Sequence, residues 1–292
     1  MRCRRALPHL PRRPGQSSSF PMNEIICGSF GSNQIPWSRN YIRVITWNIE
    51  RGLQFSGILH FLRRAEAYLI LLQEVDLNTR RTQHRDIAND LARILGLNYV
   101  FAKKFQELSQ GSDTSPAYQG LATLSPWPLT DPQVLRFQHQ SEFWKPRWYV
   151  PNLQVFQRRL GGRIALICNT SINCRKLVTY NLHLESRSKK VVRLAQLNET
   201  LVHARRNTES VVILGGDFNL ESRSSEAASA IQAAGFRDAA QISDLPTTVI
   251  RRFRRPKSID RIYVLGAAGA DGRVHSSVQA SDHTPVSALL RF

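Results

Sequence analysis

The chain has few cysteines, no long apolar run and none of the motifs that mark several common hydrolases. Its 292 residues include only four cysteines, with neither the paired spacing of a metal finger nor a dense disulfide framework. No apolar stretch approaches the roughly 18–20 residues that a membrane-spanning helix needs, so we expect no integral membrane segment. A G-x-S-x-G elbow, a G-x-x-x-x-G-K-[ST] loop and an H-E-x-x-H motif are missing too, which argues against a serine hydrolase, a P-loop enzyme and a zinc enzyme.

Acidic residues are scarce relative to basic ones. The sequence has 22 Asp and Glu against 40 Lys and Arg, which gives a formal net charge of +18. A charge of this sign and size favours polyanionic partners, either nucleic acid or an anionic membrane surface. We expect a polyanionic partner, with nucleic acid favoured over lipid.

Residues 1–40 differ in composition from the rest of the chain. They contain six arginines and a single acid, Glu24, and they are punctuated by proline and serine. No apolar segment follows the arginines, so a secretory signal is not expected. The pattern predicts a basic, flexible N-terminal extension, although its composition also resembles a transit peptide, and an upstream extension before a start at Met22 explains it equally well. The sparse cysteines fit a reducing compartment, and we expect a cytoplasmic protein.

Residues 41–292 are predicted to form one domain with more strands than helices. Short apolar runs predict strands, and apolar residues at helical spacing predict helices. The predicted strands are 42–47, 69–72, 121–124, 148–156, 164–167, 177–182, 211–214, 259–265 and 286–290, and the predicted helices are 58–68, 87–95, 192–202 and 227–234. Several strands adjoin as hairpins, which favours mixed sheets covered by helices over a barrel of alternating strands and helices.

Polar side chains follow the apolar strands at several places. The most informative is the run 211–214, which breaks at two glycines and delivers Asp217 and Asn219 just past the strand end. The same arrangement recurs at other strand ends, which carry Asn48, Glu74, His183, Asp282 and His283, and Asp260 opens a further strand in a charged pair. Each residue alone fits an ordinary turn or surface position. Together they indicate a site, because polar groups at the ends of buried strands are costly unless they are paired or liganded.

This set of side chains fits one chemistry. Hard oxygen ligands such as Glu74, with Asn48 nearby, suit Mg²⁺ or Mn²⁺. Two histidines and further carboxylates are available for proton transfer and for stabilising negative charge. The sequence therefore favours metal-assisted attack of water on a phosphoester.

The motifs also resemble a known family. The segments 46–48, 72–74, 181–185, 215–219, 259–262 and 281–283 closely resemble those of the endonuclease/exonuclease/phosphatase superfamily, and they occur in that family's order. The resemblance covers roughly residues 42–292. It implies an α/β fold: a four-layer sandwich in which two mixed, mainly antiparallel sheets pack face to face with helices outside.

The resemblance also implies roles for individual residues. Glu74 would hold one principal divalent ion, with Asn48 close by and Asp282 as a further candidate ligand. Asp217 would orient or deprotonate the attacking water, and Asn219 would help to place it. His283 would contact the scissile phosphate, with Asp260 fixing its ring. His183 would supply a second phosphate contact. Whether Asp217 or His283 is the general base stays open, because interacting groups titrate as a set.

The branch of the family is less clear from the residues. Ile-Glu-Arg-Gly stands at 49–52, where repair endonucleases carry an Asn-Gly-Leu-like run, and this argues against cleavage at abasic sites. Basic residues near the motifs are candidates for substrate binding: Arg80, Arg81, Lys189, Arg254 and Arg255. Basic residues interleaved with aromatics, as at 143–149, suit nucleic acid, but they would serve an anionic lipid surface equally well.

Three functions are compatible with these features. We favour a monomeric, Mg²⁺- or Mn²⁺-dependent nuclease that cleaves DNA or RNA. The alternative is a phosphatase or phospholipase-type enzyme acting on a phosphoinositide, a sphingolipid or a small phosphoester. A non-catalytic binding module is the third, and the intact set of acids and histidines argues against it.

Overall fold

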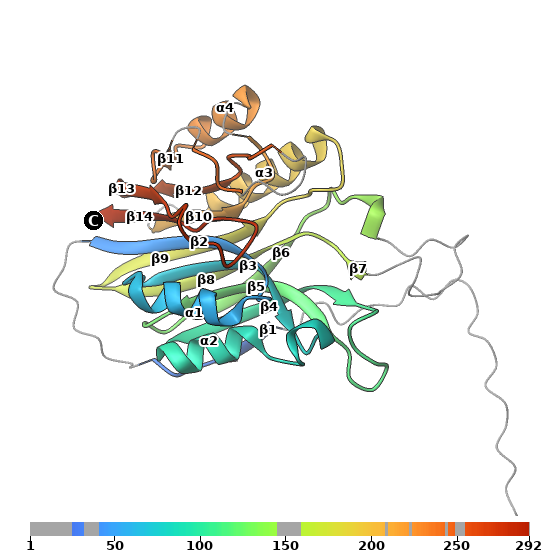
Figure 1. Ribbon diagram of the computed structural model, residues 1–292. Coiled ribbons are helices and arrows are strands. Elements are labelled where there is room, and N and C mark those ends of the chain that lie inside the picture. The colour runs from blue at the N-terminus through green and yellow to red at the C-terminus, as the bar shows by residue number, and fades with distance from the viewer. Residues whose placement is uncertain are drawn as a thin grey trace, which may run out of the picture.

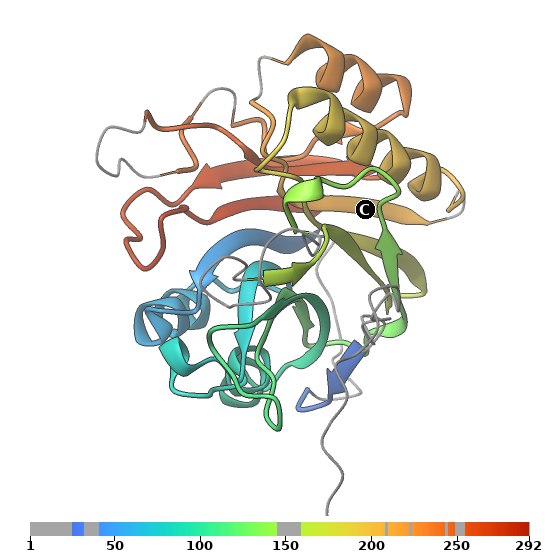
Figure 2. The same ribbon diagram turned by 90° about the vertical axis from the view of Figure 1, so that its right-hand side faces the viewer.

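The computed structural model describes residues 25–31, 41–144, 159–207, 210–221, 224–242, 245–248 and 255–291. These residues form two β-sheets packed face to face, with helices on both outer surfaces (Figures 1 and 2). The predicted four-layer sandwich is therefore confirmed. No helix in this part of the chain is long and apolar enough to span a membrane.

The larger sheet has the order β1-β4-β5-β3-β2-β14-β13, and β7 pairs with β4 outside this path. Its strands are β1 (Ile25–Gly28), β2 (Tyr41–Arg51), β3 (Leu69–Leu77), β4 (Asn98–Glu107), β5 (Tyr118–Ser125), β7 (Arg159–Gly161), β13 (Ala268–Val274) and β14 (Val286–Arg291). The smaller sheet has the order β11-β12-β10-β9-β8-β6. Its strands are β6 (Thr130–Arg136), β8 (Ile164–Ile172), β9 (Arg175–His183), β10 (Val211–Asp217), β11 (Arg237–Asp238) and β12 (Asp260–Leu265).

Two parallel pairs lie at the centre of these otherwise antiparallel sheets. β2 runs parallel to β3 in the larger sheet, and β9 runs parallel to β10 in the smaller one. Parallel neighbours end at the same edge, so the residues that follow these four central strands are brought to one side of each sheet.

Four helices cover the outer faces. They are α1 (Phe55–Arg64), α2 (Ile87–Leu95), α3 (Lys190–Ala204) and α4 (Ser225–Ala233), and short 3₁₀ turns η1 (Arg80–Thr82) and η2 (Glu142–Trp144) complete the set. Ile58 and Leu91 pack α1 and α2 on the larger sheet, whereas Leu197 and Ile231 pack α3 and α4 on the smaller one. Figure 2 shows the two helix pairs on opposite sides of the sandwich.

The core between the sheets explains the apolar runs of the sequence. Ile213 of β10 packs between the sheets with Leu71 of β3, whereas Val212 and Leu214 face the helices on the outside. A strand buried on both faces needs apolar residues at every position, which is why 211–214 shows no alternation.

One paired strand lies inside the segment that was expected to be a flexible extension. Ile25–Gly28, which lie inside the expected N-terminal extension, form β1 and pair antiparallel with β4. Four residues are too few to show the pattern of a strand in the sequence. They form a strand because they pair with β4. The predicted strand at 148–156 lies outside the described residues.

Gly216 is the glycine on which the geometry of β10 depends most. Its φ is +155°, and a Cβ there would lie 2.0 Å from the backbone oxygen of Leu182 in β9. We expect Gly216→Ala to lower the free energy of unfolding by about 1–3 kcal/mol, because two paired backbones would have to move apart. Urea unfolding would measure the change.

Gly215→Ala is the matched control for this prediction. A Cβ at Gly215 would be crowded by the Cδ1 of Leu71, at 2.5 Å, while its other neighbours lie at 3.6 Å or more, and the end of a leucine side chain can rotate away. We expect a smaller loss for this variant. Equal urea midpoints for Gly216→Ala and the wild type would contradict the argument.

Candidate active site

Strand ends from both sheets bring the predicted residues together. In the smaller sheet the register places Asp217 of β10 beside His183 of β9 on one side and beside Asp260 of β12 on the other. In the larger sheet Asn48 of β2 lies beside Gln73 of β3, next to Glu74. The carboxyl ends of four central strands thus supply most of the site, as their position in the sequence predicted.

Asp217 lies at the centre of the cluster and contacts most of its members. Its Oδ2 accepts a hydrogen bond from Asn48 Nδ2 at 3.3 Å and lies 3.5 Å from Nε2 of His183 and 3.9 Å from Nε2 of His283. Its Oδ1 accepts the backbone N–H of Asn219 at 3.0 Å. Only 2% of Asp217 is exposed. A buried carboxylate held between two imidazoles is suited to handling a proton.

The pKa of Asp217 is shifted in the direction that such a role needs. Burial and the neighbouring Asp260 raise it to about 6, although His283, the Asn219 N–H and Arg163 oppose the rise. The carboxyl group is therefore ionised at neutral pH but far more basic than an ordinary aspartate, and a base poised near the operating pH is the more effective one.

His283 is held by a carboxylate behind its ring. Its Nδ1 lies 2.9 Å from Oδ2 of Asp260, and Thr247 Oγ1 donates to the same oxygen at 2.6 Å. Burial lowers the pKa of His283, but Asp260, Asp217 and Asp282 raise it to about 10. His283 is an imidazolium at neutral pH, so it can donate a hydrogen bond to an anion but cannot accept a proton.

The loop that carries His283 is fastened to β2. Ser281 Oγ donates to the backbone oxygen of Asn48 at 2.6 Å and accepts the His283 N–H at 3.2 Å. Trp47 Nε1 donates to the backbone oxygen of His283 at 2.8 Å. These bonds join the C-terminal motif to the first motif across more than 230 residues of sequence.

Glu74 lies in a bulge of β3, next to the register pair of Asn48 and Gln73. The ladder between β3 and β5 shifts register between Gln73 and Val75, and Glu74 has a φ of 53°. Bulges re-aim a side chain next to functional sites. Burial would raise the pKa of Glu74, but Lys104, Arg51, Arg159 and Arg163 lower it to about 2. The carboxylate is therefore ionised and available as a ligand.

The donor atoms of the cluster fit a hard divalent ion. Asp217, Asp260 and His283 each present one ligand atom within 4.8 Å of the other two, and this group could hold a metal ion. The Asp260 Oδ1 is buried and has no hydrogen-bond partner among the described residues. Two of these three ligand atoms are carboxylate oxygens, and such oxygens suit Mg²⁺ or Mn²⁺ better than softer ions.

Asn219 and Asp282 lie at the margins of the cluster. Besides its N–H bond to Asp217, Asn219 donates through Nδ2 to the backbone oxygen of Leu184 at 3.1 Å. Asp282 is half-buried, its Oδ1 lies 3.5 Å from Ser281 Oγ, and its charge helps to raise the pKa of His283. Both predicted residues therefore lie beside the central group.

The basic residues predicted to bind substrate lie in different surroundings. Arg81 forms a two-pronged ion pair with Asp76, at 2.6 and 2.7 Å, and also contacts Glu107 at 3.1 Å, so its guanidinium is engaged within the fold. The other described members are exposed: Arg80, Lys189 and Arg255. Arg254 lies outside the described residues.

Two residues that contact the cluster were missed in the sequence. Thr247 donates to Asp260, and Lys104 of β4 lies 3.1 Å from Nδ1 of His183 through its Nζ. Neither carries a local signal, because Thr247 lies in an irregular segment and Lys104 is one of two adjacent lysines in an apolar strand.

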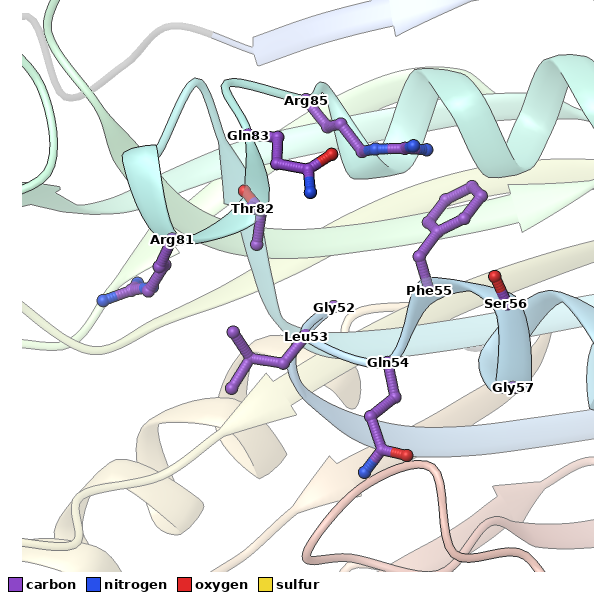
Figure 3. A pocket seen from close by; sticks show the side chains of 10 residues that line it. All are labelled: Gly52, Leu53, Gln54, Phe55, Ser56, Gly57, Arg81, Thr82, Gln83 and Arg85. Carbon is purple, nitrogen blue, oxygen red and sulfur yellow. The ribbon is translucent and has the colours of Figure 1, made fainter.

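A cavity of about 430 Å³ lies between the turns that follow β2 and β3 (Figure 3). Apolar, amide and guanidinium groups line it: Gly52, Leu53, Gln54, Phe55, Ser56, Gly57, Arg81, Thr82, Gln83 and Arg85. The Arg85 guanidinium lies 4.8 Å from the centre of the Phe55 ring. Arg51, the residue before this lining segment, lies 3.9 Å from Glu74.

Comparison with known proteins agrees with this geometry. The sequence model of the Endonuclease/Exonuclease/phosphatase family matches residues 45–283. No curated protein matches the chain significantly.

Solved structures share the fold at low sequence identity. An endonuclease/exonuclease/phosphatase from Beutenbergia cavernae has a TM-score of 0.63 and 20% identity, over 87% of this chain and 72% of that one. The human Nocturnin catalytic domain with a bound sulfate has a TM-score of 0.63 and 18% identity, over 92% and 97%. ANGEL2, a 2',3'-cyclic phosphatase in complex with adenosine-2',3'-vanadate, has a TM-score of 0.59 and 14% identity, over 86% and 96%.

Proposed function

The chain belongs to the endonuclease/exonuclease/phosphatase family, and on that premise we propose that it is a divalent-metal-dependent phosphodiesterase that cleaves nucleic acid. The observation that carries the proposal is the buried Asp217 flanked by His183 and His283, with Asp260 behind the second imidazole. Hydrolysis of a phosphoester is helped by a general base for the attacking water and by hydrogen-bond donors for the phosphate oxygens. It is helped as well by an acidic residue that can bind a metal ion.

Each residue has a role that its surroundings support. Asp217, with a pKa of about 6, accepts the proton of the attacking water. His283 is protonated at neutral pH and donates to a phosphate oxygen, while Asp260 keeps its ring charged and oriented. His183 donates a second hydrogen bond, and Asn219 helps to place the water.

We assign Mg²⁺ or Mn²⁺ to Glu74, with Asn48 and Asp282. Asp217, Asp260 and His283, the other group able to hold an ion, are then left for proton transfer and phosphate contact. A divalent ion at that position would neutralise charge on the phosphate and the leaving oxygen. Glu74 fits this role because four nearby cations keep its carboxylate ionised. The family resemblance also implies a divalent ion at this residue.

Nucleic acid is the substrate class that the charge and the cavity support best. Residues 41–292 carry 34 Lys and Arg against 21 Asp and Glu, so the excess of positive charge does not depend on the N-terminal segment. The cavity between the turns that follow β2 and β3 combines an aromatic ring with amide and guanidinium groups, which suit a base and its phosphate. The adenosine ligand of ANGEL2 shows that this fold can accommodate a nucleoside.

A substrate panel tests the proposal. The purified full chain with Mg²⁺ or Mn²⁺ is expected to cleave single-stranded or duplex DNA or RNA, and chelation with EDTA is expected to abolish cleavage. Vesicles of phosphoinositide or sphingomyelin and a phosphomonoester complete the panel. Intact nucleic acid together with hydrolysis of a lipid would refute the nuclease assignment and leave the phosphoesterase assignment standing.

Glu74→Gln tests the metal assignment. We expect it to raise the Mg²⁺ concentration needed for half-maximal activity by at least about 10-fold, since loss of even an outer-shell partner costs roughly 10–100-fold in metal affinity. Titration of Mn²⁺ binding by electron paramagnetic resonance gives a readout independent of turnover. Unchanged Mn²⁺ affinity in Glu74→Gln would remove this residue from the metal site.

A further inference from the structure

One exposed phenylalanine lies at the rim of the candidate site. Phe143 belongs to η2, and 46% of it is exposed, whereas its neighbour Trp144 is buried. The two rings meet edge to face, with their centres 4.8 Å apart. Single exposed aromatics are common on protein surfaces, so the case depends on how this ring is held and on what lies beside it.

Trp144 fastens η2 to the turn that follows β9. Its Nε1 donates to both carboxylate oxygens of Glu185, at 2.9 and 3.2 Å. The same carboxylate accepts the backbone N–H groups of Ser186 and Arg187, at 2.9 and 2.8 Å. Glu185 has no exposed surface, so these bonds are shielded from water and hold the turn and η2 together. Phe143 therefore has a fixed position relative to the end of β9.

Ser141 joins the same two segments a second time. Its Oγ donates to the backbone oxygen of Arg187 at 3.2 Å and accepts the N–H of Phe143 at 3.1 Å. The Arg187 guanidinium lies 5.5 Å from the centre of the Phe143 ring. An aromatic ring and a planar cation are thus held next to each other.

This pair lies beside the proposed reacting centre. β9 ends at His183, and Arg187 follows four residues later, so the two Cα atoms are at most ~14 Å apart. Asn219 donates through Nδ2 to the backbone oxygen of Leu184, which fastens the start of the turn to the loop after β10. Figure 2 faces the edge where the central strands end and shows η2, the short green turn, on that side of the sandwich.

The surface around Phe143 is positive. Arg187 and Lys189 are exposed on the turn, against one exposed acid on η2, Glu142. A ring beside exposed cations is the combination with which proteins bind unpaired nucleotides, because a base stacks on the ring while the cations contact phosphates.

A lipid surface fits the same side chains less well. Interfacial binding relies on an apolar face that several residues build together. Within η2 and the described turn 184–189, Phe143 is the one large hydrophobic residue that is exposed, and Trp144 is turned inward. A single ring would bury little apolar area in a membrane, but it is enough to stack one base.

We propose that Phe143 is a stacking platform for an unpaired base next to the scissile phosphate, and that Arg187 and Lys189 hold the adjoining backbone. The inference rests on the proposed nuclease function and narrows its substrate class to single-stranded DNA or RNA. A base inside a duplex is stacked on its neighbours and has no free face for the ring.

Binding of two oligonucleotides tests the stacking. The full chain is titrated in EDTA against a fluorescein-labelled oligothymidylate and against the same sugar–phosphate chain without bases, with fluorescence anisotropy as the readout. Phe143→Ala is expected to raise the Kd for oligothymidylate about 5- to 150-fold, the range for loss of one stacked base, and to leave the Kd for the base-free chain unchanged. Phe143→Trp is expected to bind both as the wild type does. Two unchanged Kd values in Phe143→Ala, or two that rise equally, would overturn the proposal.

Phe30→Ala is the matched control. Phe30 is 40% exposed, but its ring lies 6.4 Å from that of Tyr99 at the start of β4, whereas Lys104, further along that strand, contacts His183. We expect wild-type Kd values, and a loss as large as that of Phe143→Ala would overturn the assignment. The wild type itself is expected to bind oligothymidylate more tightly than the base-free chain. Equal affinities would overturn the proposal even if Phe143→Ala failed to fold.

Arg187→Gln tests the phosphate contact. Loss of one contact to a single strand is expected to lower the magnitude of the slope of log Kd against log salt concentration by about 0.7. Lys176→Gln is the matched control, because it removes the same charge from an exposed position at the start of β9, the opposite end of the strand from His183. Its slope is expected to equal that of the wild type. An unchanged slope in Arg187→Gln would remove Arg187 from the binding surface.

The outcomes separate this inference from the proposed function. Cleavage of single strands by Phe143→Ala with wild-type KM and Kd would refute the platform and leave the nuclease assignment intact. The expected Kd values without any cleavage would refute the nuclease assignment and leave the platform as a binding site. Weaker binding of Phe143→Ala to phosphatidylserine vesicles, with an unchanged Kd for oligothymidylate, would assign the ring to a membrane surface and overturn the proposal.

Discussion

Asp217→Asn is expected to reduce kcat by about 100- to 10,000-fold, the range that loss of a general base produces, with a far smaller change in KM. An amide has nearly the same shape as the carboxylate but cannot accept a proton from water. The effect should be large because, among the described residues, Asp217 is the carboxylate that lies between both imidazoles, 3.5 Å from His183 and 3.9 Å from His283.

The stability of the same variant distinguishes catalysis from folding. The fold raises the pKa of Asp217 from its ordinary value to about 6, so stability falls as the pH rises from that ordinary value to about 6, and the cost is fully present above it. An amide relieves that cost but cannot accept the hydrogen bonds of Asn48 or His183 at the same position. We expect the two effects to offset each other, with a net change in the free energy of unfolding of no more than about 1 kcal/mol in urea.

Asp131→Asn is the matched control for this variant. Asp131 is exposed on β6, its φ of 47° is tolerated by asparagine, and its carboxylate contacts only Asn169 among the described hydrogen bonds. Activity equal to the wild type is expected. If Asp217→Asn kept more than a tenth of the wild-type kcat, another group would have to be the base.

The strand ends of this site could be predicted because they follow a local pattern. Asp217, His183 and Asn48 each come at the end of an apolar run, and two parallel strand pairs bring such ends to one edge. The family resemblance added the pairing of Asp260 with His283, which the structure confirms as a contact of 2.9 Å. These residues could be predicted from the sequence because the strand ends that carry them meet at one edge of the sheets.

The charged partners could not be predicted because they depend on register across distant strands. Arg81 reads in the sequence as a free cation in a turn, but Asp76 and Glu107 meet it from β3 and β4. Lys104 reads as half of a surface Lys-Lys pair, and only the bulge in β4 and the packing of one sheet on the other direct it to His183. A one-residue change of register would reverse both assignments, and no local pattern fixes that register.

Asp260→Asn is expected to move both limbs of the pH–rate profile to lower pH. In the wild type Asp260 raises the pKa of His283 to about 10 and also raises that of Asp217, so activity should be highest between about pH 6 and 10, where Asp217 is ionised and His283 protonated. Without the carboxylate, burial lowers the pKa of His283 with only Asp217 and Asp282 opposing it, and the alkaline limb falls. The acid limb falls as well, because Asp217 loses a neighbouring negative charge.

The same variant should also lose rate at neutral pH. His283 would spend more of its time as a neutral ring, and its orientation would rest on an amide and on Thr247 in place of the ion pair of 2.9 Å. Loss of one donor to a developing charge costs about 100- to 1,000-fold in kcat, and we expect a loss in this range. The limbs report the coupled set of groups and not single residues, so the test is the shift of the whole profile of kcat against pH. A profile for Asp260→Asn that superimposes on the wild type after scaling would show that His283 does not owe its charge to Asp260.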